Sequence, residues 1–119
     1  MLNVSTEFRK GILFVRLKGH LTKDTIKKLN KRVTKVVKDN GIRKIVFNFT
    51  NLKSIDIKGI NTIFYNYELC KNNDGRSLMC GNNDNIRKKL KRSRLINYIY
   101  ETTDELSAIK ILNLRWLYE

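Results

Sequence analysis

The sequence predicts a single α/β domain with a mixed, mostly parallel sheet of about five strands and about four helices. Segments rich in β-branched and aromatic residues alternate with segments of helical apolar spacing, which favours crossover units between parallel strands. The chain of 119 residues matches the size of one domain and contains no proline, repeat or low-complexity linker. We therefore expect residues 1–119 to fold as one unit.

The first two strands are expected to form an antiparallel hairpin. Residues 2–9 and 12–17 both have strand character, the second segment more strongly, and Lys10-Gly11 supplies a tight turn between them. This hairpin would add an antiparallel strand to a sheet that is otherwise parallel.

The first helix is predicted over residues 23–39. Its apolar residues recur at helical spacing: Ile26, Leu29, Val33, Val36 and Val37. Asn40-Gly41 supplies the left-handed residue that commonly ends a helix. Residues 43–50 then alternate in the manner of a core strand, with Ile45, Phe47 and Phe49 on one side.

The second helix is predicted to follow this strand directly, with Asp56 as its N-cap. Its buried stripe consists of Ile60, Ile63, Phe64, Tyr67 and Cys70. Residues 72–75 have the composition of a turn, and residues 76–80 are predicted to form a short strand.

The last part of the chain is predicted to contain two helices and a short strand. The third helix begins near Asn83, and a strand is expected at residues 98–100. The hydroxyl of Thr103 is predicted to cap the fourth helix, with Asp104 and Glu105 near the positive end of its dipole.

The composition argues against several classes of protein. No apolar stretch approaches the roughly 18 residues of a membrane span, and residues 1–16 lack the features of a signal peptide, so we expect a cytoplasmic protein. Cys70 and Cys80 are expected to be buried thiols and not metal ligands. His20 is the single histidine, and no glycine-rich phosphate loop is present. We expect no enzyme activity, no metal and no cofactor.

A net charge of +14 indicates a surface that attracts anions, and it leaves nucleic acid, acidic lipid and acidic protein open as partners. The basic residues gather on the first and third predicted helices, and the candidate patch comprises Lys27, Lys28, Lys31, Arg32, Lys35, Arg87, Lys88, Lys91 and Arg92. A solvated helix face, a nucleic-acid contact and an acidic protein partner would each account for this pattern. Base stacking would need aromatic residues among the cations, and there are none.

Three segments of the chain, at residues 15–29, 43–60 and 86–108, resemble STAS domains, the fold of bacterial anti-sigma factor antagonists. The motifs that carry the resemblance are Gly19-His20-Leu21-Thr22, Ile55-Asp56-x-x-Gly59-Ile60 and the run from Ile86 through Ser93 and Leu95 to Glu105. The resemblance spans roughly residues 3–112. The remaining apolar extension, residues 113–119 with Trp116, would either lengthen the last helix or form an oligomer or partner patch.

The chain departs from the family pattern at three places, one of which is a pair of residues. The resemblance implies a phosphoacceptor serine after Asp56, but Ile57 and Lys58 stand where the two hydroxyl residues would be. Thr22 replaces an aspartate at the first corner, and Arg94 stands where the family tends to have glycine. The usual phosphorylation switch is therefore expected to be lost at Ile57.

The resemblance implies a non-catalytic regulator that sequesters a kinase-like anti-sigma factor and so frees a sigma factor. The partner-binding residues would be Thr22, Asp24, Asp56, Ile57, Lys58 and Gly59. Ile57 and Lys58 would form a standing contact, reflect drift after loss of the switch, or accompany a phosphosite moved to Ser54 or Thr62. A basic module associated with nucleic acid or ribosomes, or a scaffold that has lost its role, remains an alternative, and the oligomeric state is open.

Overall fold

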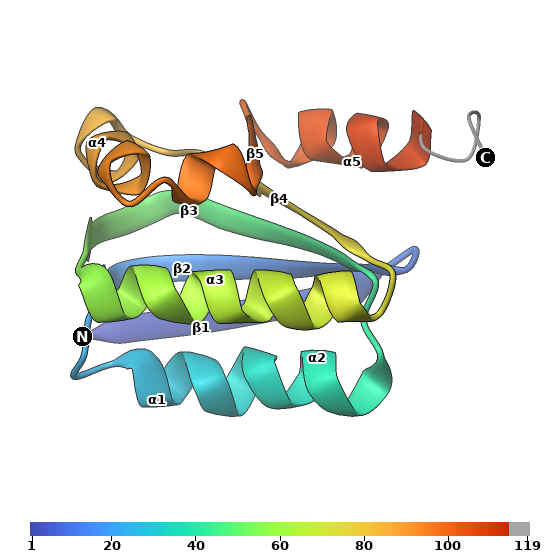
Figure 1. Cartoon of the computed structure of the whole chain (residues 1–119), viewed down its shortest axis with the longest axis horizontal. Coiled ribbons are helices and arrows are strands. Elements are labelled where there is room, and N and C mark those ends of the chain that lie inside the picture. Colours follow the sequence, from blue (N-terminus) through green and yellow to red (C-terminus); the bar gives the residue numbers. More distant parts are fainter. Residues whose placement is uncertain (115–119) are drawn as a thin grey trace.

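A five-stranded mixed sheet lies at the centre of the protein, and the computed structural model describes residues 1–114 (Figure 1). The strands lie side by side in chain order: β1 (Leu2–Arg9), β2 (Ile12–Leu21), β3 (Lys44–Ile55), β4 (Arg76–Cys80) and β5 (Tyr100–Thr102). β1 runs antiparallel to β2, and the other neighbouring pairs are parallel. The predicted fold class is confirmed.

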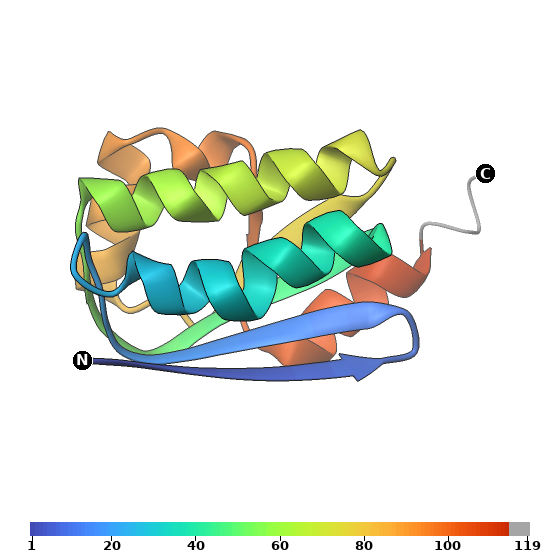
Figure 2. The same cartoon turned by 90° about the horizontal axis from the view of Figure 1, so that it is seen from below.

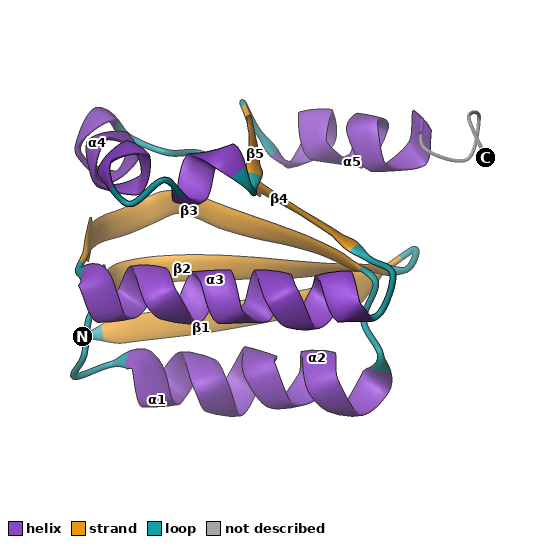
Figure 3. Cartoon of the chain, in the orientation of Figure 1, coloured by secondary structure: helices purple, strands orange, loops and turns teal. Residues whose placement is uncertain are grey.

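Helices connect the parallel strands, and a last helix follows β5 (Figure 3). They are α1 (Ile26–Leu29), α2 (Lys35–Asn40), α3 (Ile57–Asn72), α4 (Asp84–Arg92) and α5 (Glu105–Leu114). α1 and α2 are parts of one helix joined by a π-helical turn, Asn30–Thr34, where Asn30 Oδ1 accepts hydrogen bonds from Thr34 Oγ1 (3.2 Å) and Thr62 Oγ1 (2.9 Å). The predicted helix over residues 23–39 is thus present, but it starts later and contains a wider turn.

Two apolar clusters hold the helices against the two faces of the sheet. α1, α2, α3 and α4 pack on one face over the larger cluster, which includes Leu29, Ile63, Leu90 and the sheet residues Phe47 and Phe49. α5 alone packs on the other face, where Ala108 and Leu112 meet Ile12, Phe14, Val46 and Leu78. Figure 2 shows α1, α2 and α3 side by side on the face away from α5. Cys70 and Cys80 are both buried, as expected.

The predicted turns have the expected backbone geometry. Lys10 and Gly11 have φ of 52° and 79°, the left-handed pair that matches the twist of a two-residue hairpin. Gly41 ends the first helix in the left-handed region, with φ of 59° and ψ of 40°. Asp56 caps α3 by accepting a hydrogen bond from Gly59 N.

Four details of the predicted elements were wrong. β2 runs to Leu21 and not only to residue 17. β3 extends to Ile55, beyond the predicted end at residue 50, because it pairs with β2 as far as Leu21. β5 occupies Tyr100–Thr102 and not residues 98–100, since Tyr98 packs instead against the Phe64 ring at 5.2 Å. The cap of α5 is Asp104, whose Oδ1 accepts from Ser107 N at 2.8 Å, and not the Thr103 hydroxyl.

The apolar extension predicted for residues 113–119, including Trp116, lies outside the described residues from position 115 onward. Within residues 1–114, no helix combines the length and the apolarity that crossing a membrane requires.

Candidate functional site

Asp56 joins two segments at the carboxyl edge of the parallel strands. Its Oδ1 accepts from Gly59 N at 2.8 Å, which satisfies a backbone donor in the first turn of α3. Its Oδ2 accepts from Lys23 N at 2.9 Å, in the loop that leads from β2 to α1. Partial burial disfavours the charged carboxylate, but the backbone N–H groups of Gly59 and Lys23 outweigh it, so the pKa of Asp56 lies below its ordinary value.

Gly59 lets the start of α3 approach the end of β2. A Cβ on Gly59 would collide with the carbonyl oxygen of Leu21 and would lie 3.0 Å from the Ile55 side chain. Gly59 is buried, so it offers no side chain to a partner. Its part in the predicted partner-binding set is to let the neighbouring residues take up their positions.

Ile57 and Lys58 occupy the first turn of α3 and are both exposed. The Ile57 side chain has 63% of its surface accessible, although isoleucine is usually buried. Thr22 and Asp24 are brought near by the bond between Lys23 and Asp56, and Thr22 Oγ1 accepts from Asp24 N at 3.3 Å. The structure therefore gathers the predicted partner-binding residues at one edge of the sheet.

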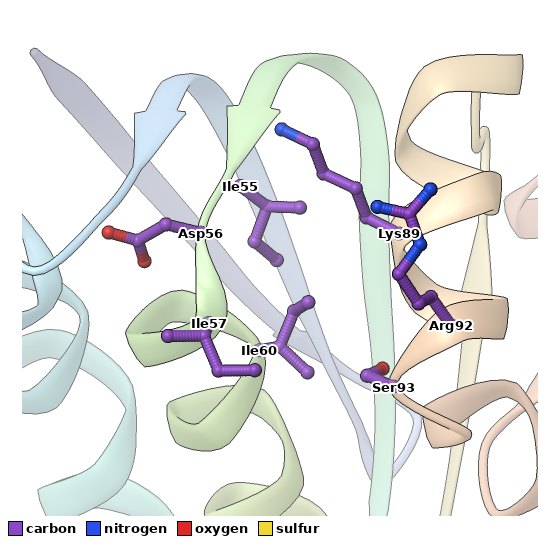
Figure 4. Close-up of a pocket in the computed structure, with 7 residues that line it drawn as sticks. All are labelled: Ile55, Asp56, Ile57, Ile60, Lys89, Arg92 and Ser93. Atoms are coloured by element: carbon purple, nitrogen blue, oxygen red, sulfur yellow. The ribbon is translucent and has the colours of Figure 1, made fainter.

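A pocket of about 290 Å³ lies between the start of α3 and the end of α4. Its lining residues are Ile55, Asp56, Ile57, Ile60, Lys89, Arg92 and Ser93. Figure 4 shows Ile57 and Ile60 on one side, Lys89 and Arg92 on the other, and the Asp56 carboxylate pointing away from both cations. Apolar and cationic side chains thus share one hollow.

A second pocket of about 220 Å³ continues this hollow along α3 and shares Ile57, Ile60 and Ser93 with the first. Phe64, Leu95 and Tyr98 add further apolar surface, and Tyr98 is 56% exposed. We refer to the two pockets together as the α3–α4 groove. Sequence reasoning did not include Lys89, Phe64 and Tyr98 in the site, because their approach to Ile57 depends on how α4 packs.

The residues of the predicted basic patch are of two kinds, exposed cations and one ion-paired arginine. Lys27, Lys28, Lys31, Arg32 and Lys35 are exposed on the first helix, and Lys88, Lys91 and Arg92 are exposed on α4. Arg87 is different: its Nη2 lies 2.6 Å from Glu101 Oε2 and its Nη1 lies 2.9 Å from Asp84 Oδ1. Hydrogen bonding to Glu101 raises the pKa of Arg87. Arg87 anchors α4 to β5 and is not a free cation, which corrects its place in the patch.

The two hydroxyls considered as moved phosphosites are both engaged. Thr62 is buried and donates to Asn30 Oδ1. Ser54 Oγ lies 2.6 Å from His20 Nδ1, at the paired ends of β2 and β3. Within residues 1–114, no group of three or more His, Cys, Asp or Glu side chains could hold a metal ion.

The model of the STAS domain matches residues 3–108 of the chain. The chain belongs to the STAS domain family. The match covers all five strands except Leu2 of β1 and extends into the first turn of α5, so the resemblance inferred from the motifs is confirmed.

The relatives of this STAS protein include anti-sigma factor antagonists. The chain is 25% identical over 108 residues to the anti-sigma F factor antagonist of Paenibacillus polymyxa, a match that covers 91% of this chain and 92% of that protein. An anti-sigma factor antagonist from Mycobacterium paratuberculosis has a similar structure, with a TM-score of 0.85, 14% identity and 95% of each chain covered. SpoIIAA, a Bacillus cell fate determinant, in its phosphorylated form gives a TM-score of 0.73 at 17% identity, covering 92% of this chain and 99% of that one. The two structural matches show the fold. The family match makes the chain a STAS protein, and this protein is similar to a curated anti-sigma factor antagonist.

Proposed function

We propose that this STAS protein sequesters a kinase-like anti-sigma factor in the cytoplasm, frees a sigma factor, and cannot be switched by phosphorylation at the usual position. The observation that carries the proposal is the exposed Ile57 at the start of α3, on the rim of the α3–α4 groove. Asp56 and Gly59 retain the helix start, while the residue that would accept phosphate has become apolar. In this proposal the protein keeps the surface that binds the anti-sigma factor but lacks the phosphorylation site that would switch binding off.

A partner that covers Ile57 would gain apolar burial. Completing the burial of such a side chain is worth on the order of 1–2 kcal/mol, which is the size of one useful interface contact. Lys58 lies beside Ile57, and Lys89 and Arg92 line the same groove, so the matching partner surface is apolar and acidic.

Capture from the native cell tests the proposal. The full chain, immobilised, should retain a kinase-like anti-sigma factor, which is then purified and titrated against the variants. Ile57→Asp should weaken binding at least about tenfold, because it places a charge in an apolar contact. Leu106→Asp is the matched control, since Leu106 is 60% exposed on α5, on the other face of the sheet. Equal loss in both variants, or no loss in either, would contradict a contact at Ile57.

Ile57→Ser tests whether the surface still docks a kinase. With ATP and the recovered anti-sigma factor, this variant should take up phosphate at position 57, whereas the natural chain should not. Phosphate uptake by the natural chain at Ser54 or Thr62 would show that the switch has moved and would overturn its proposed loss.

Nucleic-acid association is a second candidate, favoured by the exposed lysines of the first helix. Binding of this kind should weaken steeply between 50 and about 200 mM salt, because each phosphate contact releases counterions. Recovery of RNA in place of an anti-sigma factor, with this salt dependence, would favour the second candidate.

A further inference from the structure

A separate hollow of about 520 Å³ lies where the ends of β2 and β3 meet the start of β1. It is lined by Met1, Leu2, Asn3, Lys18, Gly19, His20, Lys28 and Lys53. None of these residues lines the α3–α4 groove. We call this hollow the lysine pocket. It does not depend on the proposed binding of an anti-sigma factor.

The lysine pocket collects positive charge from three elements. Lys18 comes from β2, Lys28 from α1 and Lys53 from β3. Within residues 1–114, no Asp or Glu lines the pocket, and no carboxylate forms an ion pair with any of these lysines. Like charges that converge without a counter-charge repel one another, and an anion held among them removes that cost.

The floor of the lysine pocket is fixed by the fold. His20 N donates to Met1 O at 2.8 Å, which draws the start of β1 against the end of β2. Gly19 has φ of 107°, and a Cβ there would collide with the Met1 carbonyl, so the close approach requires glycine. His20 Nδ1 is hydrogen-bonded to Ser54 Oγ at 2.6 Å, which orients the ring.

We propose that the lysine pocket binds a small oligophosphate, a chain of two or three phosphate groups, through Lys18, Lys28, Lys53 and His20. A volume of about 520 Å³ lies within the range of small-molecule sites. Lysine binds phosphate as a point charge, so three separate lysines suit a ligand with several phosphate groups. Among residues 1–114, no Phe, Tyr or Trp lines the pocket, so none of their rings stacks on a base there. Recognition is directed at the phosphates, and an attached nucleoside adds little.

Isothermal titration of the full chain with inorganic tripolyphosphate, at 0.15 M salt, tests the proposal. The variant Lys18→Gln/Lys28→Gln/Lys53→Gln should bind at least about tenfold more weakly than the natural chain. The control Lys38→Gln/Lys71→Gln/Lys110→Gln removes the same number of charges from exposed lysines outside the pocket, and it should bind within about twofold of the natural chain. Equal losses in the two variants, or no binding by the natural chain, would overturn the proposal.

Two further measurements guard this result. If the triple variant does not fold, Lys53→Gln and Lys38→Gln are compared alone, and only the first should weaken binding. ATP and GTP should bind the natural chain with affinities within about threefold of tripolyphosphate, because the bases make no stacking contact. Single-stranded RNA that binds tighter than tripolyphosphate and loses affinity in both triple variants alike would instead indicate a general nucleic-acid surface, and would refute a pocket for small oligophosphates.

Discussion

The Asp56 carboxylate holds the start of α3 in place, whatever side chain follows it. Its two oxygens bind the first turn of α3 and the loop after β2, through Gly59 N and Lys23 N. Both bonds hold the backbone, and neither requires a hydroxyl at position 57. The backbone geometry of this helix start is therefore held independently of the side chain at position 57.

Asp56→Asn should destabilise the protein by about 1 kcal/mol at pH 7. An asparagine oxygen still caps α3, but its amide nitrogen cannot accept the hydrogen bond from Lys23 N. The folded-state pKa of Asp56 is depressed, so its stabilising effect is present above the unfolded pKa and is lost as pH falls through the folded value. The free energies of unfolding of the two proteins, measured in urea, should therefore begin to converge below about pH 4 and meet only when the pH has fallen below the depressed folded-state pKa.

Asp24→Asn is the matched control for this prediction. Asp24 is an exposed carboxylate in the same loop. The Asp24→Asn substitution removes the same charge without breaking either hydrogen bond of Asp56. Its effect on unfolding should be within about 0.5 kcal/mol of zero at any pH. A gap between natural and Asp56→Asn proteins that stays constant down to pH 3 would show that the charge of Asp56 does not stabilise the fold.

Local patterns in the sequence predicted some of the helices and strands, but they did not predict features that depend on contacts between distant residues. The apolar patterns predicted α3 and β4 well, because α3 buries a stripe at helical spacing, β4 is a short run of buried residues, and both patterns are local. The π-helical turn at Asn30–Thr34 depends on a bond from Thr62, far away in the chain, and therefore leaves no local signal. The α3–α4 groove could not be predicted for the same reason, because Lys89 and Tyr98 come close to Ile57 only when distant segments of the chain pack together. The motif around Asp56 was readable since its capping bond spans three residues.

Arg94, between α4 and the 3-10 turn Leu95–Asn97, carries a backbone strain. Its φ is 68° and its ψ is 9°, in the left-handed region where a Cβ is unfavourable. The departure from the family's glycine thus falls at a position that favours glycine. Arg94→Gly should stabilise the protein by roughly 1 kcal/mol relative to Arg94→Ala, which removes the same side chain and keeps the Cβ. Urea unfolding of the two variants gives the comparison, and equal stabilities would mean that the junction relaxes without cost.

The charges of the whole molecule are unevenly neutralised. Every ion pair found within residues 1–114 uses an arginine, namely Arg9, Arg16 or Arg87. Arg16 binds Glu105 and so anchors α5 to the sheet, and the hydrogen bond from Arg16 lowers the pKa of Glu105. The lysines of the first helix and of the lysine pocket have no such partners within the same residues. The chain carries a net charge of +14, and most of the positive charges at its surface have no counter-charge and repel one another.

This excess predicts that sodium chloride stabilises the protein. Screening shortens the range of the repulsion from about 30 Å at 0.01 M salt to roughly 3 Å at 1 M, and the arginine pairs are too few to reverse the sign. Thermal unfolding should shift upward by several degrees between these concentrations, since about 1 kcal/mol of relieved repulsion moves the Tm by roughly 4 °C in a domain of this size. Chloride is the suitable anion, because phosphate would also occupy the lysine pocket. A variant in which six lysines, those of the two triple variants, are changed to glutamine should show a smaller shift. A Tm that falls with salt would mean that the ion pairs of Arg16 and Arg87, and not the unpaired lysines, dominate the electrostatics of the fold.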